Sequence, residues 1–290
     1  MTLERTVSSD GVSLAVREWP ALRSVQNAST ALLLHGLASS SHIWDLVAPR
    51  LADAGMRAVA IDQRGHGRSS KPSSAYGFDA TVSDAAAVIR ALRLGRPVVA
   101  GHSWGANVAL ELAIARPRSV SALVLVDGGF LSLRERMDWP TARRELAPPE
   151  IAGLHMDDLL GWARTELGRT LDVTPEIEAV VLSLMHVDRD GKIRPRLSRA
   201  NHLRILRALW AQDTIGLLRR VRVPTLVLAV RAIAGTPDSA GFLEEKERAA
   251  RIVRSIGDPV RFAWVEGIHD LPLLKPGVVA RRILRSADSS

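Results

Sequence analysis

Cysteine is absent from the whole chain of 290 residues. Its absence excludes disulfide bonds, thiol catalysis and zinc–thiolate sites. The chain also lacks an apolar run long enough to span a bilayer, and its first residues lack the basic stretch and apolar core of a secretory signal. A reducing compartment is compatible with a cysteine-free chain. We therefore expect a cytoplasmic protein that has no membrane partner.

Lysine is scarce, because 4 of the 39 basic residues are lysine and 35 are arginine. Aromatic residues make up only 4% of the chain, and the arginines are scattered rather than interleaved with them. The densest arginine stretch, residues 194–207, has the mixed spacing of a solvated helical face. The formal net charge of +8 therefore does not indicate a nucleic-acid partner.

Short apolar segments alternate with helix-forming segments over most of the chain. Asp10-Gly11 separates two segments, 3–8 and 12–19, and predicts a β-hairpin. Further strands are expected where apolar runs suit burial on both faces: 31–34, 57–61, 98–100, 122–126, 224–230 and 260–265. Helices are expected between or after them: 43–54, 78–92, 104–116, 241–256 and 276–285.

Residues 130–220 interrupt this alternation. They contain no clear strand, and their amphipathic helical pieces are broken by several prolines. We interpret this segment as an inserted helical cap on a core formed by residues 1–129 and 221–290. The expected fold class is α/β: a doubly wound, mostly parallel eight-stranded sheet with helices on both faces and the cap inserted.

The segment from Val98 to Leu110 is the one around which the rest of the chain is organised. A short β-branched run ends in Gly101-His102-Ser103-Trp104-Gly105 and continues directly into helix-forming residues. In a strand–turn–helix of this kind, the serine is held in a strained backbone with its Oγ clear of the sheet. The two glycines are needed because side chains there would collide where strand and helix pass closely.

Five polar side chains follow predicted strands directly: His35, Asp62, Ser103, Asp127 and His269. The carboxyl ends of parallel strands meet at one edge of a sheet, where α/β proteins place their chemistry. We therefore expect these side chains to share one site.

Three motifs together give the chain its resemblance to the α/β-hydrolase fold family. They are His35-Gly36, the Gly-x-Ser-x-Gly segment at 101–105, and Gly267-Ile268-His269-Asp270. The turn at residues 62–69 also looks like one of the family. The resemblance implies that Ser103 is the nucleophile and His269 the base that accepts its proton. It also implies an oxyanion hole formed by the backbone N–H groups of Trp104 and Leu37.

The acid of the triad is the open position, with Asp127 preferred over Asp238. The family's commoner acid follows a later strand, in a pattern that begins here with Pro224-Thr225-Leu226. Ile233 stands where that pattern has its acid, and an isoleucine cannot orient an imidazole. A longer loop could still bring Asp238 back to the site. Asp127 closes an earlier strand, a position that some branches of the fold use.

These residues predict a serine hydrolase that cleaves ester-type bonds, a carboxylesterase or lactonase, through an acyl-serine intermediate. The expected substrate is a hydrophobic small-molecule ester or lactone, because the cap carries more apolar surface than it can hide. Alternatives are a carbon–carbon bond hydrolase, a perhydrolase, or a ligand-sensing protein with little turnover. No cofactor and no metal are expected, since no spacing of histidines or carboxylates supports a metal site. Nothing in the sequence indicates an oligomeric state.

Overall fold

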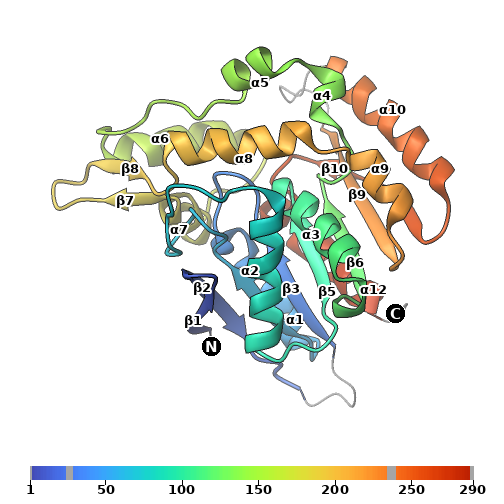
Figure 1. Cartoon of the computed structure of the whole chain (residues 1–290). Coiled ribbons are helices and arrows are strands. Elements are labelled where there is room, and N and C mark those ends of the chain that lie inside the picture. Colours follow the sequence, from blue (N-terminus) through green and yellow to red (C-terminus); the bar gives the residue numbers. More distant parts are fainter. Residues whose placement is uncertain (1, 24–28, 234–239, 288–290) are drawn as a thin grey trace.

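The computed structural model describes residues 2–23, 29–233 and 240–287 (Figure 1). Eight strands form one sheet, in the order β1-β2-β4-β3-β5-β6-β9-β10. Their bounds are β1 Leu3–Ser9, β2 Val12–Trp19, β3 Thr30–Leu34, β4 Arg57–Ile61, β5 Val98–His102, β6 Ala122–Val126, β9 Thr225–Ala232 and β10 Val260–Gly267. Strand β1 pairs antiparallel with β2, and β2 with β4, whereas the pairs from β4 to β10 are parallel. The predicted mostly parallel sheet of eight strands is confirmed.

Helices cover both faces of the sheet. Helices α2 (Phe78–Ala91), α3 (Trp104–Ala115) and α10 (Ala240–Ile256) contribute to one apolar cluster, on one face. Helices α1 (Ala48–Asp53) and α12 (Pro276–Ala287) pack on the other. Because every residue of β6 is buried, that strand is apolar throughout rather than alternating.

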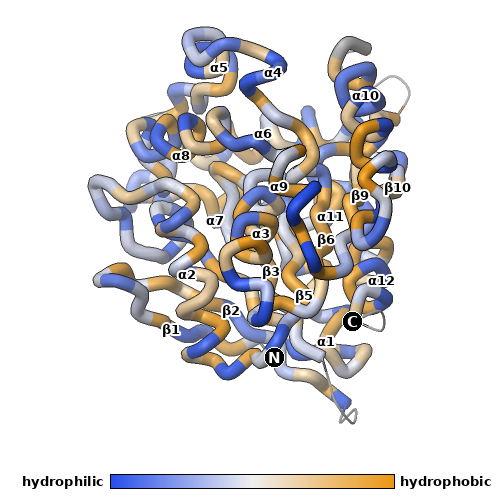
Figure 2. The backbone as a smooth tube through the Cα atoms, turned by 45° about the vertical axis from the view of Figure 1, so that its right-hand side comes forward, coloured by the Kyte–Doolittle hydropathy of each residue, from blue (hydrophilic) through white to orange (hydrophobic). Residues whose placement is uncertain are grey.

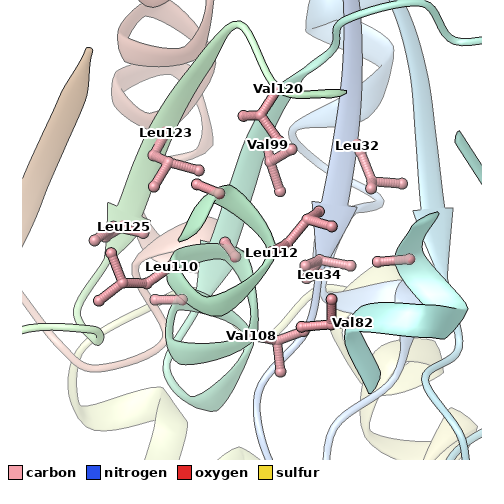
Figure 3. Close-up of a cluster of buried hydrophobic side chains, with 14 of the residues drawn as sticks. Leu32, Leu34, Val82, Val99, Val108, Leu110, Leu112, Val120, Leu123 and Leu125 are labelled. Atoms are coloured by element: carbon pink, nitrogen blue, oxygen red, sulfur yellow. The ribbon is translucent and has the colours of Figure 1, made fainter. Parts of the chain in front are cut away.

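Helix α3 lies at the centre of the first face. Figure 3 shows its Val108, Leu110 and Leu112 among side chains of the neighbouring strands, including Leu34 and Leu125. The tube in Figure 2 shows the corresponding hydrophobic segments along the inner strands β5 and β9. This packing fixes the start of α3, and with it the position of the preceding serine, against the sheet.

The expected helix over residues 43–54 is wrong as one element. The structure has a 3₁₀ helix, η1 (Ser41–Trp44), followed by α1 from Ala48. Pro49 lies in the first turn of α1, where its missing N–H costs nothing. A helix running through Pro49 would lose a backbone hydrogen bond, so the chain begins a new helix instead.

Between β6 and β9 the chain forms a separate set of elements; in Figure 1 α5, α6 and α8 lie above the sheet and β7 and β8 lie to its left. These are α4 Leu133–Arg136, α5 Trp139–Glu145, α6 Met156–Glu166, η3 Leu167–Arg169, α7 Pro175–Ser183, β7 Met185–Val187, β8 Ile193–Pro195, α8 Arg199–Ala211 and α9 Thr214–Arg220. The remaining short elements of the chain are η2 Pro117–Ser119 and α11 Leu271–Leu274. No helix in the described ranges has both the length and the apolar character needed to cross a membrane.

Residues 130–220, in which the sequence shows no clear strand, do contain a short hairpin. Strands β7 and β8 pair antiparallel over three residues each. Their turn is built on Asp188, whose Oδ1 accepts hydrogen bonds from the backbone N–H groups of Asp190 and Lys192. Three-residue strands are too short to show an alternating pattern, so this hairpin depends on its turn chemistry.

Candidate active site

Ser103 lies between β5 and α3 in a backbone conformation that is rare for a residue with a side chain. Its φ is 52° and its ψ is −123°. The close passage of strand and helix explains the flanking glycines. A Cβ on Gly101 would lie 2.2 Å from the carbonyl oxygen of Gly105, and one on Gly105 would lie 2.3 Å from that of Leu34. The strained turn predicted at this motif is therefore present.

Asp127 and His269 meet although 142 residues separate them in the chain. Asp127 follows β6, and His269 follows β10. The Nδ1–H of His269 donates to Oδ2 of Asp127 over 2.7 Å, and the backbone N–H of Val230 donates to Oδ1 over 2.9 Å. The Asp127 side chain is 1% exposed and that of His269 is 54% exposed. The carboxylate is thus fixed, and the imidazole reaches from it towards solvent.

The charges of this pair shift both pKa values. Burial raises the pKa of Asp127, but the His269 hydrogen bond and nearby positive charges outweigh it, so the pKa lies below its usual 3.8. Burial lowers the pKa of His269, but Asp127 raises it above 6.5. Because half of the imidazole is exposed, solvent limits the penalty of burial and the raised direction holds. The arrangement stabilises a protonated imidazole beside an ionised acid.

A cavity of about 380 Å³ joins these residues to Ser103. Its lining combines the three polar residues with apolar side chains from the sheet's helices and from the inserted segment: Trp104, Phe130, Leu131, Leu133, Leu209, Ile215, Phe242, Ala249 and Ile252. Charged residues also line it, namely Glu135, Arg136, Glu245 and Arg248. A surface depression of about 520 Å³ elsewhere, beside Arg164 and residues 168–173, contains none of the three polar residues.

Within the cavity, no hydrogen bond joins the Ser103 hydroxyl to His269 in the described structure. Catalytic hydrogen bonds are often long before substrate binds and shorten in the complex. Both residues nevertheless line the same cavity, so one ligand there is able to contact both.

The two backbone groups expected to form an oxyanion hole belong to Trp104, which directly follows Ser103, and to Leu37. Trp104 is the first residue of α3, so its N–H has no partner within the helix. Leu37 follows Gly36, on which a Cβ would lie 3.0 Å from the Cβ of Ser103. Among the described residues, neither N–H has a hydrogen-bond acceptor. Of these two residues Trp104 lines the cavity and Leu37 does not, so their joint role as an oxyanion hole stays a prediction.

His102, which precedes Ser103, braces the loop of His269. Its Nε2–H donates to the backbone carbonyl of His269 over 2.9 Å, and the two ring centroids are 4.8 Å apart. Burial, together with the charge of His269, lowers the pKa of His102 to about 4, so this imidazole is neutral near pH 7. The expectation that His102 is a packed, bracing side chain is confirmed.

The expectation that all five polar residues share one site is wrong for His35 and Asp62. Neither lines the cavity. His35 Nε2 accepts from the N–H of Gln63 over 3.0 Å, and Asp62 accepts from the N–H groups of Ser41 and Arg68 over 2.8 Å each. These residues hold two loops together. No group of three or more metal-ligating side chains is found in the described ranges.

Asp238, the alternative acid, lies outside the described residues. Sequence reasoning missed Lys246 and Arg248, both of helix α10. The signal for Lys246 was available: Phe242, Lys246, Ala249 and Val253 follow helical spacing, which places a charged residue on the buried face of the helix.

Comparison with known proteins gives consistent matches. A family model described as alpha/beta hydrolase fold matches residues 32–158. The 2-(acetamidomethylene)succinate hydrolase of Mesorhizobium japonicum is 28% identical over 247 residues, which cover 85% of this chain and 83% of the relative. An epoxide hydrolase of Caballeronia sordidicola is 35% identical over 142 residues, 46% of this chain and only 41% of the relative.

A crystal structure of E-2-(acetamidomethylene)succinate hydrolase is similar in fold, with a TM-score of 0.77 at 24% identity. The match covers 99% of this chain and 100% of that one. At this level of identity the likeness concerns the fold.

Proposed function

Since this chain belongs to the α/β-hydrolase fold family, we propose that it is a serine hydrolase that cleaves ester-type bonds of a hydrophobic small molecule. The single observation that carries the proposal is the 2.7 Å contact between His269 and the buried Asp127, in a cavity that Ser103 also lines. A serine hydroxyl needs a base to take its proton as it attacks, and an imidazole held by a carboxylate is such a base.

The proposed reaction has two halves. Ser103 Oγ attacks the carbonyl carbon while its proton passes to Nε2 of His269, and the N–H groups of Leu37 and Trp104 bind the resulting oxyanion. Collapse of this intermediate breaks the bond to the alcohol, which leaves with the proton from His269. Water then attacks the acyl-serine with the same base, and Ser103 recovers its proton as the acid departs. Asp127 holds the imidazole tautomer and stabilises the imidazolium throughout.

Residues 130–220 are proposed to act as the cap over a core of residues 1–129 and 221–290. Leu131, Leu133, Leu209 and Ile215 bring apolar surface from this segment to the cavity. Burying an acyl or alcohol chain against them removes apolar area from water, at about 25 cal/mol per Å². A substrate with hydrophobic bulk is therefore favoured over a small polar ester.

A second candidate substrate carries a carboxylate beside its apolar part. Arg248 lines the cavity and forms no ion pair with a carboxylate of the described residues, whereas Arg136 is bound to Glu245 over 3.0 Å. An unpaired guanidinium suits a carboxylate, since it can donate two parallel hydrogen bonds. The similar 2-(acetamidomethylene)succinate hydrolase is named for a succinate derivative, which agrees with this candidate.

The experiment combines covalent labelling with a substrate panel. We expect a fluorophosphonate probe to label the protein once, on the peptide that contains Ser103. Aryl esters of increasing acyl length and a series of lactones should be hydrolysed with an initial burst of the chromogenic product. Labelling of another residue, or ligand-induced stabilisation with negligible turnover of every substrate, would contradict the proposed function.

A further inference from the structure

Lys246 is buried against the carboxylate that holds His269. Its side chain is 4% exposed, and Nζ lies 3.1 Å from Oδ1 and 3.2 Å from Oδ2 of Asp127. Nζ also donates to the backbone carbonyl of Val230 over 3.1 Å and lies 4.7 Å from the ring centroid of Phe242. The ammonium group thus donates two hydrogen bonds, to Oδ2 of Asp127 and to the carbonyl of Val230, and forms an ion pair with the same carboxylate.

The surroundings of Asp127 leave the carboxylate no freedom to turn. His269 binds Oδ2, the N–H of Val230 binds Oδ1, and the ammonium of Lys246 lies within reach of both oxygens. Val230 contributes its N–H to the acid and its carbonyl to the lysine, so strand β9 and helix α10 are tied to the acid at one point. Lysine is rarely buried unless it is paired, and its only carboxylate among the described residues is Asp127.

From this geometry we propose that Lys246 is a positioning residue of the active site. Its ammonium group fixes the Asp127 carboxylate towards His269 and offsets part of the acid's negative charge. The proposal rests on the proposed function, because positioning has a consequence for turnover only if His269 acts as the base.

The charges around His269 determine the direction of the effect. Asp127 and Asp270 stabilise its protonated form, Lys246 opposes it from α10, and His102 faces it from β5 as a neutral ring. Across the cavity, Glu245 is neutralised by Arg136, and Arg248 stands on the same helix as Lys246. Lys246 therefore limits how far Asp127 raises the pKa of His269, and keeps the base unprotonated closer to neutral pH.

Two substitutions separate the charge of Lys246 from its hydrogen bonds. Lys246→Gln removes the charge and keeps a donor, whereas Lys246→Met removes both. In each variant we expect the acid limb of the pH profile of kcat/KM, measured on a hydrolysed aryl ester, to move to higher pH by about one unit. The imidazole pKa of His269, measured by NMR on the full chain, should rise equally. Only Lys246→Met should also lower the plateau kcat, by roughly tenfold with little change in KM.

Arg251→Met is the matched control, since Arg251 is an exposed cation of the same helix. It should change neither the acid limb of kcat/KM nor the pKa of His269. An unchanged acid limb and His269 pKa in both Lys246 variants, or a shift to lower pH, would overturn the proposal. If either variant fails to fold, the His269 pKa is measured by NMR in Asp127→Asn and in Asp127→Asn/Lys246→Met. Removing Lys246 from this background leaves no buried carboxylate without a partner. A rise in the His269 pKa in a protein that hydrolyses no ester would refute the proposed function alone.

Discussion

Two clusters at the carboxyl edge of the sheet use the same residue types for different purposes. The first contains His35, Asp62 and His66, which are at most 3% exposed. The second contains Asp127 and His269 beside Ser103, and its imidazole is half exposed in a cavity. In each cluster a buried aspartate follows a strand; Asp62 accepts two backbone N–H groups and Asp127 accepts one.

The two clusters differ in how many imidazole nitrogens already have a hydrogen-bond partner. Nδ1–H of His66 donates to the carbonyl of Arg64 over 3.0 Å, and Nε2 accepts from Ala38 over 3.2 Å, so both ring nitrogens are occupied. The ring also stacks on Trp104, with centroids 5.4 Å apart. His269 has Nδ1 occupied by Asp127, and no hydrogen bond to its Nε2 is found among the described residues. An imidazole can transfer a proton only from a nitrogen that is free to meet substrate, so the first cluster braces the loops and the second is open for chemistry.

The largest expected effect on turnover comes from replacing Ser103, compared with Ser41, whose backbone N–H binds Asp62 of the first cluster. Ser103→Ala should lower kcat by about 10⁶, because the nucleophile and its base act as a unit. It should abolish fluorophosphonate labelling and leave Tm nearly unchanged. Ser41→Ala, in the braced cluster and outside the cavity, should retain labelling and turnover. Full activity of the Ser103 variant, with a label elsewhere, would remove the assignment of the nucleophile.

The two aspartates give the next effect. Asp127→Asn should lower kcat by about 10⁴, since the amide no longer holds the correct imidazole tautomer. Asp62→Asn should instead destabilise the fold by about 1–3 kcal/mol, because one N–H donor then faces an amide NH₂, and turnover per folded molecule should change little.

Urea unfolding and steady-state kinetics on both proteins check this contrast. Asp238→Asn, measured alongside, should behave like the wild type. Collapse of turnover in the Asp238 variant with near-normal turnover in the Asp127 variant would transfer the role of the acid to Asp238.

Acidification should act on the two clusters in opposite directions. Burial lowers the pKa of His35 and His202 below 6.5, that of His66 well below it and that of His102 to about 4, whereas Asp127 raises that of His269. Below about pH 6.5 these buried histidines are protonated in the unfolded chain but stay neutral in the folded one. The free energy of unfolding therefore decreases by about 1.4 kcal/mol for each histidine per pH unit, until the pH reaches its folded pKa. The contribution of His269 has the other sign: it is present below pH 6.5 and is lost as the pH rises through its folded pKa.

Unfolding midpoints in urea between pH 7 and pH 5 test this prediction, and they should decrease as protons are added. A midpoint that stays constant or rises over this range would show that the buried histidines do not control acid stability. His66→Gln, which cannot take up a proton, should flatten the dependence relative to the wild type.

The smallest effect concerns substrate choice at the open cluster. Arg248→Met should lower kcat/KM for an aryl ester with a terminal carboxylate by at most about fivefold, relative to the neutral ester of equal length, since exposed ion pairs contribute about 0.2–1 kcal/mol. Arg251→Met is the control for loss of charge on the same helix. An equal change of kcat/KM for both esters would show that Arg248 does not recognise the carboxylate of the substrate.

The sequence by itself determined the sheet and most of its order along the chain. Apolar strands such as β6 are recognisable because both of their faces are buried. The strand–turn–helix at Ser103 is recognisable because Gly101 and Gly105 stand where a side chain would collide. Ser103, Asp127 and His269 were each recognisable as polar residues directly after a strand. Local pattern suffices for these features because each depends on neighbouring residues in the chain.

Only the tertiary structure decided which of those polar residues meet. His35 and Asp62 carry the same local signal as Asp127, yet their hydrogen bonds close them off from the cavity. Lys246 comes to Asp127 across 119 residues of chain, through the packing of α10 beside β9 and β10. Such contacts depend on the spatial order of strands and on which helix face is buried, and burial of a charge becomes visible only when its partner from a distant segment is in place.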